Sequence, residues 1–204
     1  MTNGRPGQRE RRKAATREAL GRAALRLAAE RGAENVRVRD IAAEAGVSPR
    51  TFNNYFSSKA EAIVYRHRAR LGEAAEALRG RPAGEPLWEA LTRALLAPYE
   101  DAGGQPAPRW TPADRRVLHE PALQAELLRD GVDAAAGLAA AVAARTGTDP
   151  ERDLYPKLVA GAALAAVRAA ADQHLAADPP VPFPPLLAEA LRQLAAGLPD
   201  PARR

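Results

Sequence analysis

Five polar side chains crowd one short stretch of the 204-residue chain, around two aromatic residues at helical spacing. They bring a guanidinium, a hydroxyl, two amides and a phenol together: Arg50, Thr51, Asn53, Asn54 and Tyr55. Phe52 and Phe56, four residues apart, would anchor one helical face in a core and leave the polar groups outside. Arg and Asn form paired hydrogen bonds with base edges, Thr contacts a thymine methyl, and Tyr reaches phosphate. The stretch predicts a helix that reads bases with the first four residues and holds phosphate with Tyr55.

The residues before this helix are typical of a helix-turn-helix. Ile41 and Ala45 give a short apolar stripe, and Gly46 ends that helix because glycine tolerates a left-handed conformation. Ser48 then caps a second helix, and Pro49 suits its first position. The plainer alternative is a helical hairpin on the surface of an all-α protein. The adjacent asparagines count against it, because Asn is a poor residue for a helix interior.

A third helix opens directly after the aromatic pair. Ser58 and Glu61 form a capping box, and the pattern continues to about Leu78. Lys59 stands at the positive end of this helix, where phosphate is favoured, and is therefore predicted to hold phosphate. The arginines further along the helix are expected to be solvated: Arg66, Arg68 and Arg70.

These segments together resemble the N-terminal signature of TetR-type transcriptional regulators over the first quarter of the chain. The matching residues are Val38-Arg39-Asp40-Ile41-Ala42, Ala45-Gly46-Val47-Ser48, Thr51-Phe52, Tyr55-Phe56 and Ser58-Lys59. The resemblance implies a DNA-binding domain over residues 1–58, followed by a linker helix and an effector-binding and dimerisation domain over 59–204. It also implies that Arg37 or Arg39, or both, reach DNA at the start of the first helix of the motif, with Arg39 on phosphate.

Composition argues against an enzyme. The chain has no cysteine and three histidines, and it lacks a phosphate-binding glycine loop. His119-Glu120 stands beside a proline and not in an HExxH zinc pattern. We therefore expect no catalytic residue, no metal and no cofactor. The net charge is +7 over residues 1–59 and −2 over the remainder, which fits a basic DNA-binding part joined to a part with another task.

The remaining pattern predicts an all-α chain of about nine helices, with no strand. One helix is expected from Thr111 to about Glu120, and the last from Leu186 to about Leu198, after a proline-rich connection over 178–185. The polar, basic N-terminus gives no sign of a signal peptide, and no run looks long and apolar enough to span a membrane. A cytoplasmic protein without membrane contact is expected.

An effector pocket is predicted in the middle helices, where aromatic residues concentrate. Its proposed lining is Trp88, Leu91, Leu95, Tyr99, Trp110, Leu118, Leu123 and Leu127. The alternative is ordinary core packing. The stretch from Trp110 to Ala177 further resembles regulators that respond to fatty-acyl or acyl-CoA-like ligands, which implies such an effector.

A homodimer interface is predicted on the last two long helices. It combines a small-residue surface with a leucine seam: Leu158, Ala162, Ala165, Ala169, Leu187, Leu191 and Leu194. The alternative is that both stripes face the core of their own chain. A dimer would occupy a palindromic double-stranded operator whose half-sites lie about one DNA turn apart, or a multiple of it.

The sequence thus predicts a dimeric repressor that a small apolar or acyl-type effector releases from its operator. Two alternatives stay open: a transcriptional activator of the same fold, and a helical ligand-binding protein without DNA binding.

Overall fold

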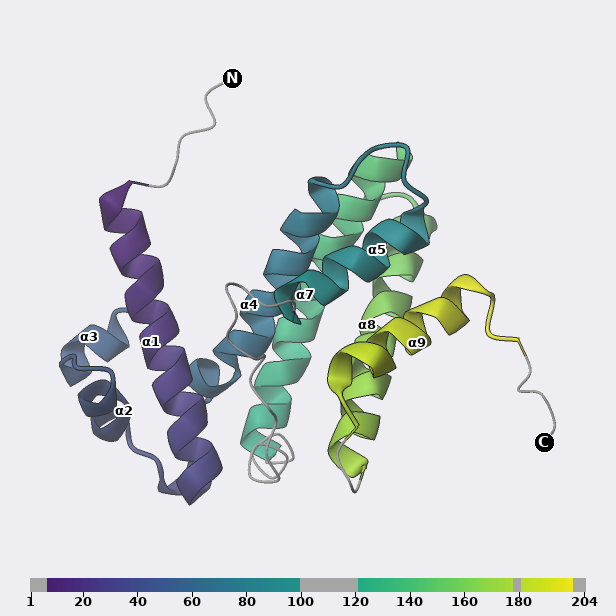
Figure 1. Cartoon of the computed structure of the whole chain (residues 1–204). Coiled ribbons are helices and arrows are strands. Elements are labelled where there is room, and N and C mark those ends of the chain that lie inside the picture. Colours follow the sequence, from purple (N-terminus) through teal and green to yellow (C-terminus); the bar gives the residue numbers. More distant parts are fainter. Residues whose placement is uncertain (1–6, 100–120, 178–180, 200–204) are drawn as a thin grey trace. The chain divides into compact units, whose positions relative to one another are not determined.

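Figure 1 shows the computed structural model of the chain, which describes residues 7–99, 121–177 and 181–199. In these ranges every regular element is helical, as predicted. Two are short 3-10 helices, η1 (Ala33–Asn35) and η2 (Ala97–Tyr99). The eight α-helices are α1 (Gln8–Arg31), α2 (Val38–Glu44), α3 (Pro49–Asn53), α4 (Lys59–Arg79), α5 (Leu87–Leu96), α7 (Pro121–Thr146), α8 (Leu154–Ala176) and α9 (Phe183–Ala195). The further helix expected near Thr111 lies outside the described residues.

The chain divides into two compact units. The first comprises described residues 7–67 and 121–128, and the second comprises 68–99, 129–177 and 181–199. The division therefore falls inside α4, between His67 and Arg68, and inside α7, between Leu128 and Arg129. The boundary predicted from the sequence falls between residues 58 and 59, at the start of α4. Each unit thus contains part of α4 and part of α7.

The core of the first unit is built on the apolar face of α1 that its spacing predicts. Leu20, Ala24, Leu27 and Ala28 are at most 1% exposed. Leu123, from the first turn of α7, is buried in the same cluster. The large side chains that complete this core come from the helix-turn-helix and the start of α4: Val36, Ile41, Phe52, Phe56 and Ile63.

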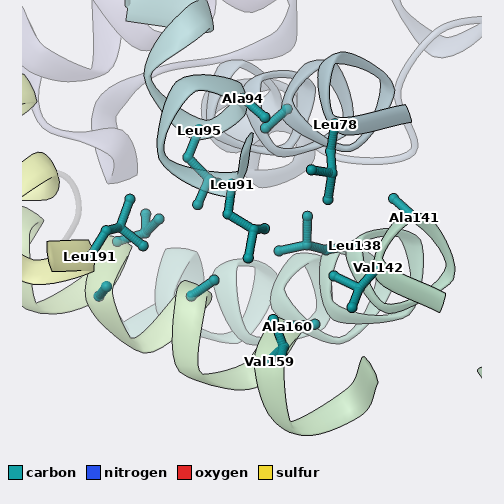
Figure 2. Packing of buried hydrophobic residues seen from close by; sticks show 14 of the residues in the cluster. Leu78, Leu91, Ala94, Leu95, Leu138, Ala141, Val142, Val159, Ala160 and Leu191 are labelled. Atoms are coloured by element: carbon teal, nitrogen blue, oxygen red, sulfur yellow. The ribbon is translucent and has the colours of Figure 1, made fainter. Parts of the chain in front are cut away.

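The core of the second unit joins α4, α5, α7, α8 and α9 (Figure 2). Leucine or valine is buried in it from every one of these helices, and alanine is buried beside them, as at Ala94, Ala141 and Ala160. Because alanine adds little volume and loses no side-chain entropy, these helices can pack closely at small cost. The last helix, α9, packs against α8 and α5.

A carboxylate and an arginine fix the loop between α4 and α5. The Glu85 side chain is only 7% exposed and accepts hydrogen bonds from Arg81 Nε and Nη2, both 2.7 Å away, and from Arg93. Arg145, at the end of α7, donates to the backbone oxygens of Arg81 (3.3 Å), Pro82 (2.6 Å) and Glu85. These charge-assisted bonds tie the turn to two helices of the second unit.

The start of the last helix differs from the expectation because of proline. The final helix begins at Phe183, three residues before the predicted start, with Pro184 and Pro185 in its first turn. Likewise α8 begins at Leu154 and contains Pro156 in its first turn. The first backbone N–H groups of a helix have no partner within it, so proline costs nothing there. Prolines that suggested a connection therefore belong to the helices.

The α8 helix also corrects the expectation about membrane-spanning runs. Leu154–His174 is long and apolar enough to cross a membrane by length and composition alone, and only 39% of that stretch is buried. Alanine and leucine on an exposed face account for this result: Leu154 and Leu158 are 74% and 62% exposed. The helix therefore has an apolar face that the described chain does not cover.

Candidate nucleic-acid interface

The turn between α2 and α3 is closed by the residues that the sequence singled out. Gly46 has φ +68°, and its N–H donates to Ala43 O (3.1 Å). Val47 N donates to Ala42 O (2.9 Å), which completes a Schellman motif at the end of α2. Ser48 Oγ then accepts from Thr51 N (3.1 Å), and Pro49 opens α3. The predicted glycine stop and serine cap are confirmed.

The reading helix α3 is held by its two phenylalanines. Phe52 and Phe56 are 1% and 2% exposed, with ring centroids 5.6 Å apart. Arg50 and Asn54 share the face opposite Phe52, because they are four residues apart, and both are exposed. Asn53 is exposed beside them. Three side chains able to bond base edges thus point away from a fixed core.

Two other predicted contacts are less accessible. The Thr51 hydroxyl lies 2.9 Å from Ser48 Oγ, and both side chains serve the helix cap. Tyr55 is half-buried and packs against the core of the first unit. Within this structure Ser48 and Thr51 shape the start of α3, while the Tyr55 side chain is partly exposed.

The two arginines at the start of α2 are exposed. The Asp40 carboxylate accepts from Arg37 N (3.3 Å), which fixes the first turn of the helix. Arg39 Nε lies 3.7 Å from the same carboxylate. Arg37 has no carboxylate within ion-pair distance among the residues that the structure describes, so its charge is available to a partner. Arg39 is partly neutralised by its neighbour.

Lys59 has a different role from the predicted one. Its ammonium donates to three backbone oxygens that follow α1: Ala33 O (2.8 Å), Glu34 O (3.1 Å) and Val36 O (3.0 Å). An ammonium has three N–H donors, and all three are used here. Lys59 therefore joins the start of α4 to the turn before α2. We correct its assignment from a phosphate contact to a structural one.

Further ion pairs, which the sequence did not reveal, tie α1 to α4. Arg17 Nη2 lies 3.3 Å from Glu61 Oε1, and Glu18 Oε2 lies 3.1 Å from Arg66 Nη1. Glu61 also accepts from Ser57 N (2.8 Å) and Ser57 Oγ (2.9 Å), while Glu61 N donates to Ser58 Oγ (3.0 Å). The serine half of the predicted capping box is present, and the Glu61 carboxylate binds Ser57, one residue before the predicted cap. Arg66, which was expected to be solvated, takes part in these contacts between α1 and α4.

Aromatic packing adds to the contact between α1 and α4. The Arg17 guanidinium lies over the rings of Phe56 and Tyr65, 5.2 and 5.3 Å from their centroids, and the two rings meet edge to face at 5.4 Å. Gly21 lets α1 approach, because a Cβ there would lie 2.5 Å from Tyr65 Cδ1. The first half of α4 is thus held firmly to α1.

The described residues that were predicted to line an effector pocket divide between the cores of the two units. Leu91 and Leu95 are fully buried in the core of the second unit, with Trp88 and Tyr99 packed at its edge. Leu123 and Leu127 belong to the core of the first unit. The remaining two, Trp110 and Leu118, lie outside the described residues. The spacing of apolar residues did not show that α7 divides between two cores.

A polar cluster that the sequence did not indicate lies in the second unit. Arg70 is 6% exposed, and its guanidinium lies 4.9 Å from the ring centroid of Tyr99. Arg68 Nη1 lies 3.7 Å from the buried carboxylate of Asp130. The expectation that Arg68 and Arg70 are solvated is therefore wrong, since both act inside the unit.

The residues proposed for dimerisation separate into two groups. Leu187 and Leu191 are 0% exposed and pack in the core of their own chain, which corrects their assignment to a dimer surface. Leu194 is partly buried against the same core. On α8, Leu158, Ala165 and Ala169 are exposed and Ala162 is half-buried. Of the residues proposed for dimerisation, those on α8 are the ones exposed enough to meet a second copy.

Comparison with known proteins agrees with this architecture. Residues 20–63 match the family described as "Bacterial regulatory proteins, tetR family", and residues 85–199 match "MftR C-terminal domain". The chain is 35% identical over 159 residues to the HTH-type transcriptional regulator TcmR of Streptomyces glaucescens, across 76% of this chain and 70% of that protein.

Solved structures share the fold at low identity. A Rhodococcus sp. protein assigned to the TetR family of transcriptional regulators aligns over 91% of this chain and all of its own, with a TM-score of 0.56 and 20% identity. Thermus thermophilus FadR, a TetR-family repressor in complex with lauroyl-CoA, aligns over 92% of this chain and 97% of its own, with a TM-score of 0.51 and 21% identity. The helix-turn-helix, the all-helical second unit and these matches together show that the chain belongs to the TetR family of DNA-binding transcriptional regulators.

Proposed function

We propose that this regulator is a cytoplasmic, non-enzymatic repressor that reads its operator with the exposed face of α3. One observation carries this proposal: Arg50 and Asn54 stand side by side opposite a fully buried Phe52. Arg pairs with guanine and Asn with adenine in the major groove, and such contacts need side chains held in fixed positions. Asn53, next to Asn54 in the chain, and Arg37, before α2, add further exposed polar groups.

The operator is expected to be palindromic because the repressor acts as a dimer. We base the dimer on α8, whose exposed stripe of Leu154, Leu158, Ala165 and Ala169 is apolar and uncovered. A second copy related by a two-fold axis would bury this stripe against itself. Small residues let two such helices approach closely, as in a four-helix bundle.

The dimer is tested by Leu158→Arg, which puts a charge at the centre of the stripe. Sedimentation should then show a monomer at concentrations where the wild type is a dimer. Val132→Arg, at an equally exposed apolar position on α7, is the matched control and should leave the dimer intact. A dimer that persists in Leu158→Arg would place the interface elsewhere.

The reading face is tested on duplexes selected by the protein from a random-sequence library. Arg50→Ala and Asn54→Ala should each weaken binding to the selected duplex about 10- to 100-fold, because a paired contact to a base contributes about 1–3 kcal/mol. Binding to unrelated DNA should change little. Arg31→Ala is the control, because Arg31 is an exposed arginine at the C-terminal end of α1. Selection without enrichment, or wild-type affinity in both variants, would overturn the proposal.

The effector is proposed to be small and apolar or acyl-type, and to bind in the second unit. The support is the apolar, alanine-rich core of that unit and a fold shared with a repressor captured with lauroyl-CoA. A ligand can release DNA only if it binds the DNA-free state more tightly. Lauroyl-CoA should therefore lower the affinity for the selected duplex and raise the thermal midpoint of the free protein. If an apolar compound without an acyl chain releases the DNA, the assignment as a repressor stands and the proposed ligand class changes. Promoter activity that rises with the protein in a reporter strain would favour an activator.

A further inference from the structure

The first two turns of α1 present a basic face of their own. Arg9, Arg12 and Lys13 follow each other at helical spacing, and all three side chains are exposed. Thr16 continues the same face one turn later. The face from Arg9 to Thr16 extends about 10 Å along the axis, at 1.5 Å per residue. Arg11, equally basic and exposed, points to the opposite side of the helix.

This face forms one wall of an open groove in the first unit. The groove has a volume of about 600 Å³. Arg9, Arg12, Lys13 and Thr16 line it from α1, together with Gln8 and Glu10. The other wall consists of Thr51, Asn54 and Tyr55, from α3 and the turn that follows it. Asn54 therefore belongs both to the reading face and to the rim of this groove.

The cations of the groove differ from the arginines next to them in sequence. Arg17, Arg22 and Arg26, in the following turns of α1, each lie within ion-pair distance of a glutamate. By contrast, no carboxylate in the described part of the chain lies within that distance of Arg9, Arg12 or Lys13. Glu10 is the one acidic residue that lines the groove, so its lining keeps a net charge of +2.

We propose that this groove holds the sugar–phosphate strand of duplex DNA that flanks the half-site read by α3. This inference rests on the proposed operator binding and adds a second contact element to it. Unpaired cations along a helix suit a polyanion, and a strand gains one phosphate for about every 3.4 Å of duplex axis. The Tyr55 hydroxyl lines the same groove and can donate to a phosphate oxygen. Because the groove adjoins the reading face, a strand that leaves the major groove at α3 would enter it directly.

The proposal predicts how affinity depends on salt. The logarithm of the binding constant falls linearly with the logarithm of the salt concentration. Each phosphate that a cation neutralises makes this slope steeper by about 0.9, whatever the DNA sequence. The variant Arg9→Ala/Arg12→Ala/Lys13→Ala should therefore lower that slope by about 2 to 3 for each bound protomer. Specific and non-specific binding should weaken by the same factor, tenfold or more, because phosphate contacts carry no sequence information.

The test compares four full-length proteins on the selected duplex and on an unrelated duplex. Wild type and Arg11→Ala should share one salt slope, while the triple variant has a smaller one. Glu10→Gln should bind both duplexes more tightly than wild type. Hydroxyl-radical footprints should show that the triple variant loses protection of sugars outside the half-sites and keeps it within them. Circular dichroism verifies that each protein keeps its helical content.

Three results would overturn the inference. A triple variant with the wild-type slope and footprint would show that the groove takes no phosphate, while operator binding itself would stand. An equal loss in Arg11→Ala would show that overall charge acts, and not this face of α1. A wild-type protein that binds neither duplex would reject the proposed function together with this inference.

Discussion

Replacement of Lys59 by methionine separates two roles that the residue could have. Methionine keeps the length and apolar packing of the stem and removes the ammonium. Two of the three bonds that it would lose, to Ala33 O and Val36 O, are partly buried. A hydrogen bond from a charged donor contributes at least about 1.5 kcal/mol, so the loss should be about 3 kcal/mol. The bond to Glu34 O is exposed, and water can replace it.

A loss of about 3 kcal/mol lowers the ratio of folded to unfolded protein about a hundredfold, since 1.36 kcal/mol corresponds to a factor of ten. Hydrogen exchange measured by mass spectrometry should show faster opening of α2 and of the end of α1. Lys13→Met, the same change at an exposed lysine without such bonds, should alter stability by no more than about 0.5 kcal/mol. The salt dependence of DNA binding should distinguish the two variants in the other direction. Its slope should be unchanged in Lys59→Met and less steep in Lys13→Met.

The reasoning about Lys59 is refuted by the reverse pattern. If Lys59→Met exchanges like wild type and binds DNA with a smaller salt slope, the ammonium contacts phosphate and the three backbone bonds contribute little. The two substitutions remove the same charge from the same unit, so the comparison does not depend on net charge.

Other substitutions test the packing and the caps through chemical denaturation. Gly21→Ala should destabilise the protein by about 1–3 kcal/mol, because the new methyl meets the Tyr65 ring; Gly72→Ala, where the methyl meets nothing, should stabilise it by up to about 1 kcal/mol. Glu85→Gln should cost about 2 kcal/mol, because a buried carboxylate loses its charge beside two arginines, and an unmoved midpoint would contradict that. Ser48→Ala should cost about 1 kcal/mol by removing the cap of α3, and a variant as stable as wild type would show that the cap is dispensable.

The DNA-binding half could be predicted from sequence because its signals are local. A glycine stop, a serine cap and two phenylalanines four residues apart each determine the conformation of the residues around them. Gly46, Ser48 and Phe52 do in the structure what their types require. The apolar face of α1 followed from spacing alone for the same reason. Local rules also placed Arg50, Asn53 and Asn54 outside, but they did not predict that Thr51 and Tyr55 are half-buried.

The roles of long charged side chains could not be predicted, because they depend on partners distant in sequence. Lys59 finds its three oxygens 23 to 26 residues earlier, and Arg66 finds its glutamate 48 residues earlier. Apolar periodicity has a related limit. It shows that Leu187 and Leu191 share a face, but not whether that face meets its own chain or a second copy. The burial of both in the core decided the question.

The contacts around α4 restrict how a ligand could act on DNA binding. Lys59, Glu61 and Arg66 fix the first two turns of α4 to α1 and to the turn before α2. A displacement that reaches these turns would therefore move the helix-turn-helix as one body, and not α3 alone. In a dimer such a movement changes the distance between two reading helices, on which a palindromic operator depends. Leu123 adds a second connection, because α7 begins in the first core and continues into the second unit. If a ligand shifts an equilibrium between a DNA-binding and a DNA-free state almost completely, it must bind one state about 10⁴-fold more tightly than the other, about 5.5 kcal/mol. A change in the second unit can reach the DNA-binding unit along α4, along α7 or along both.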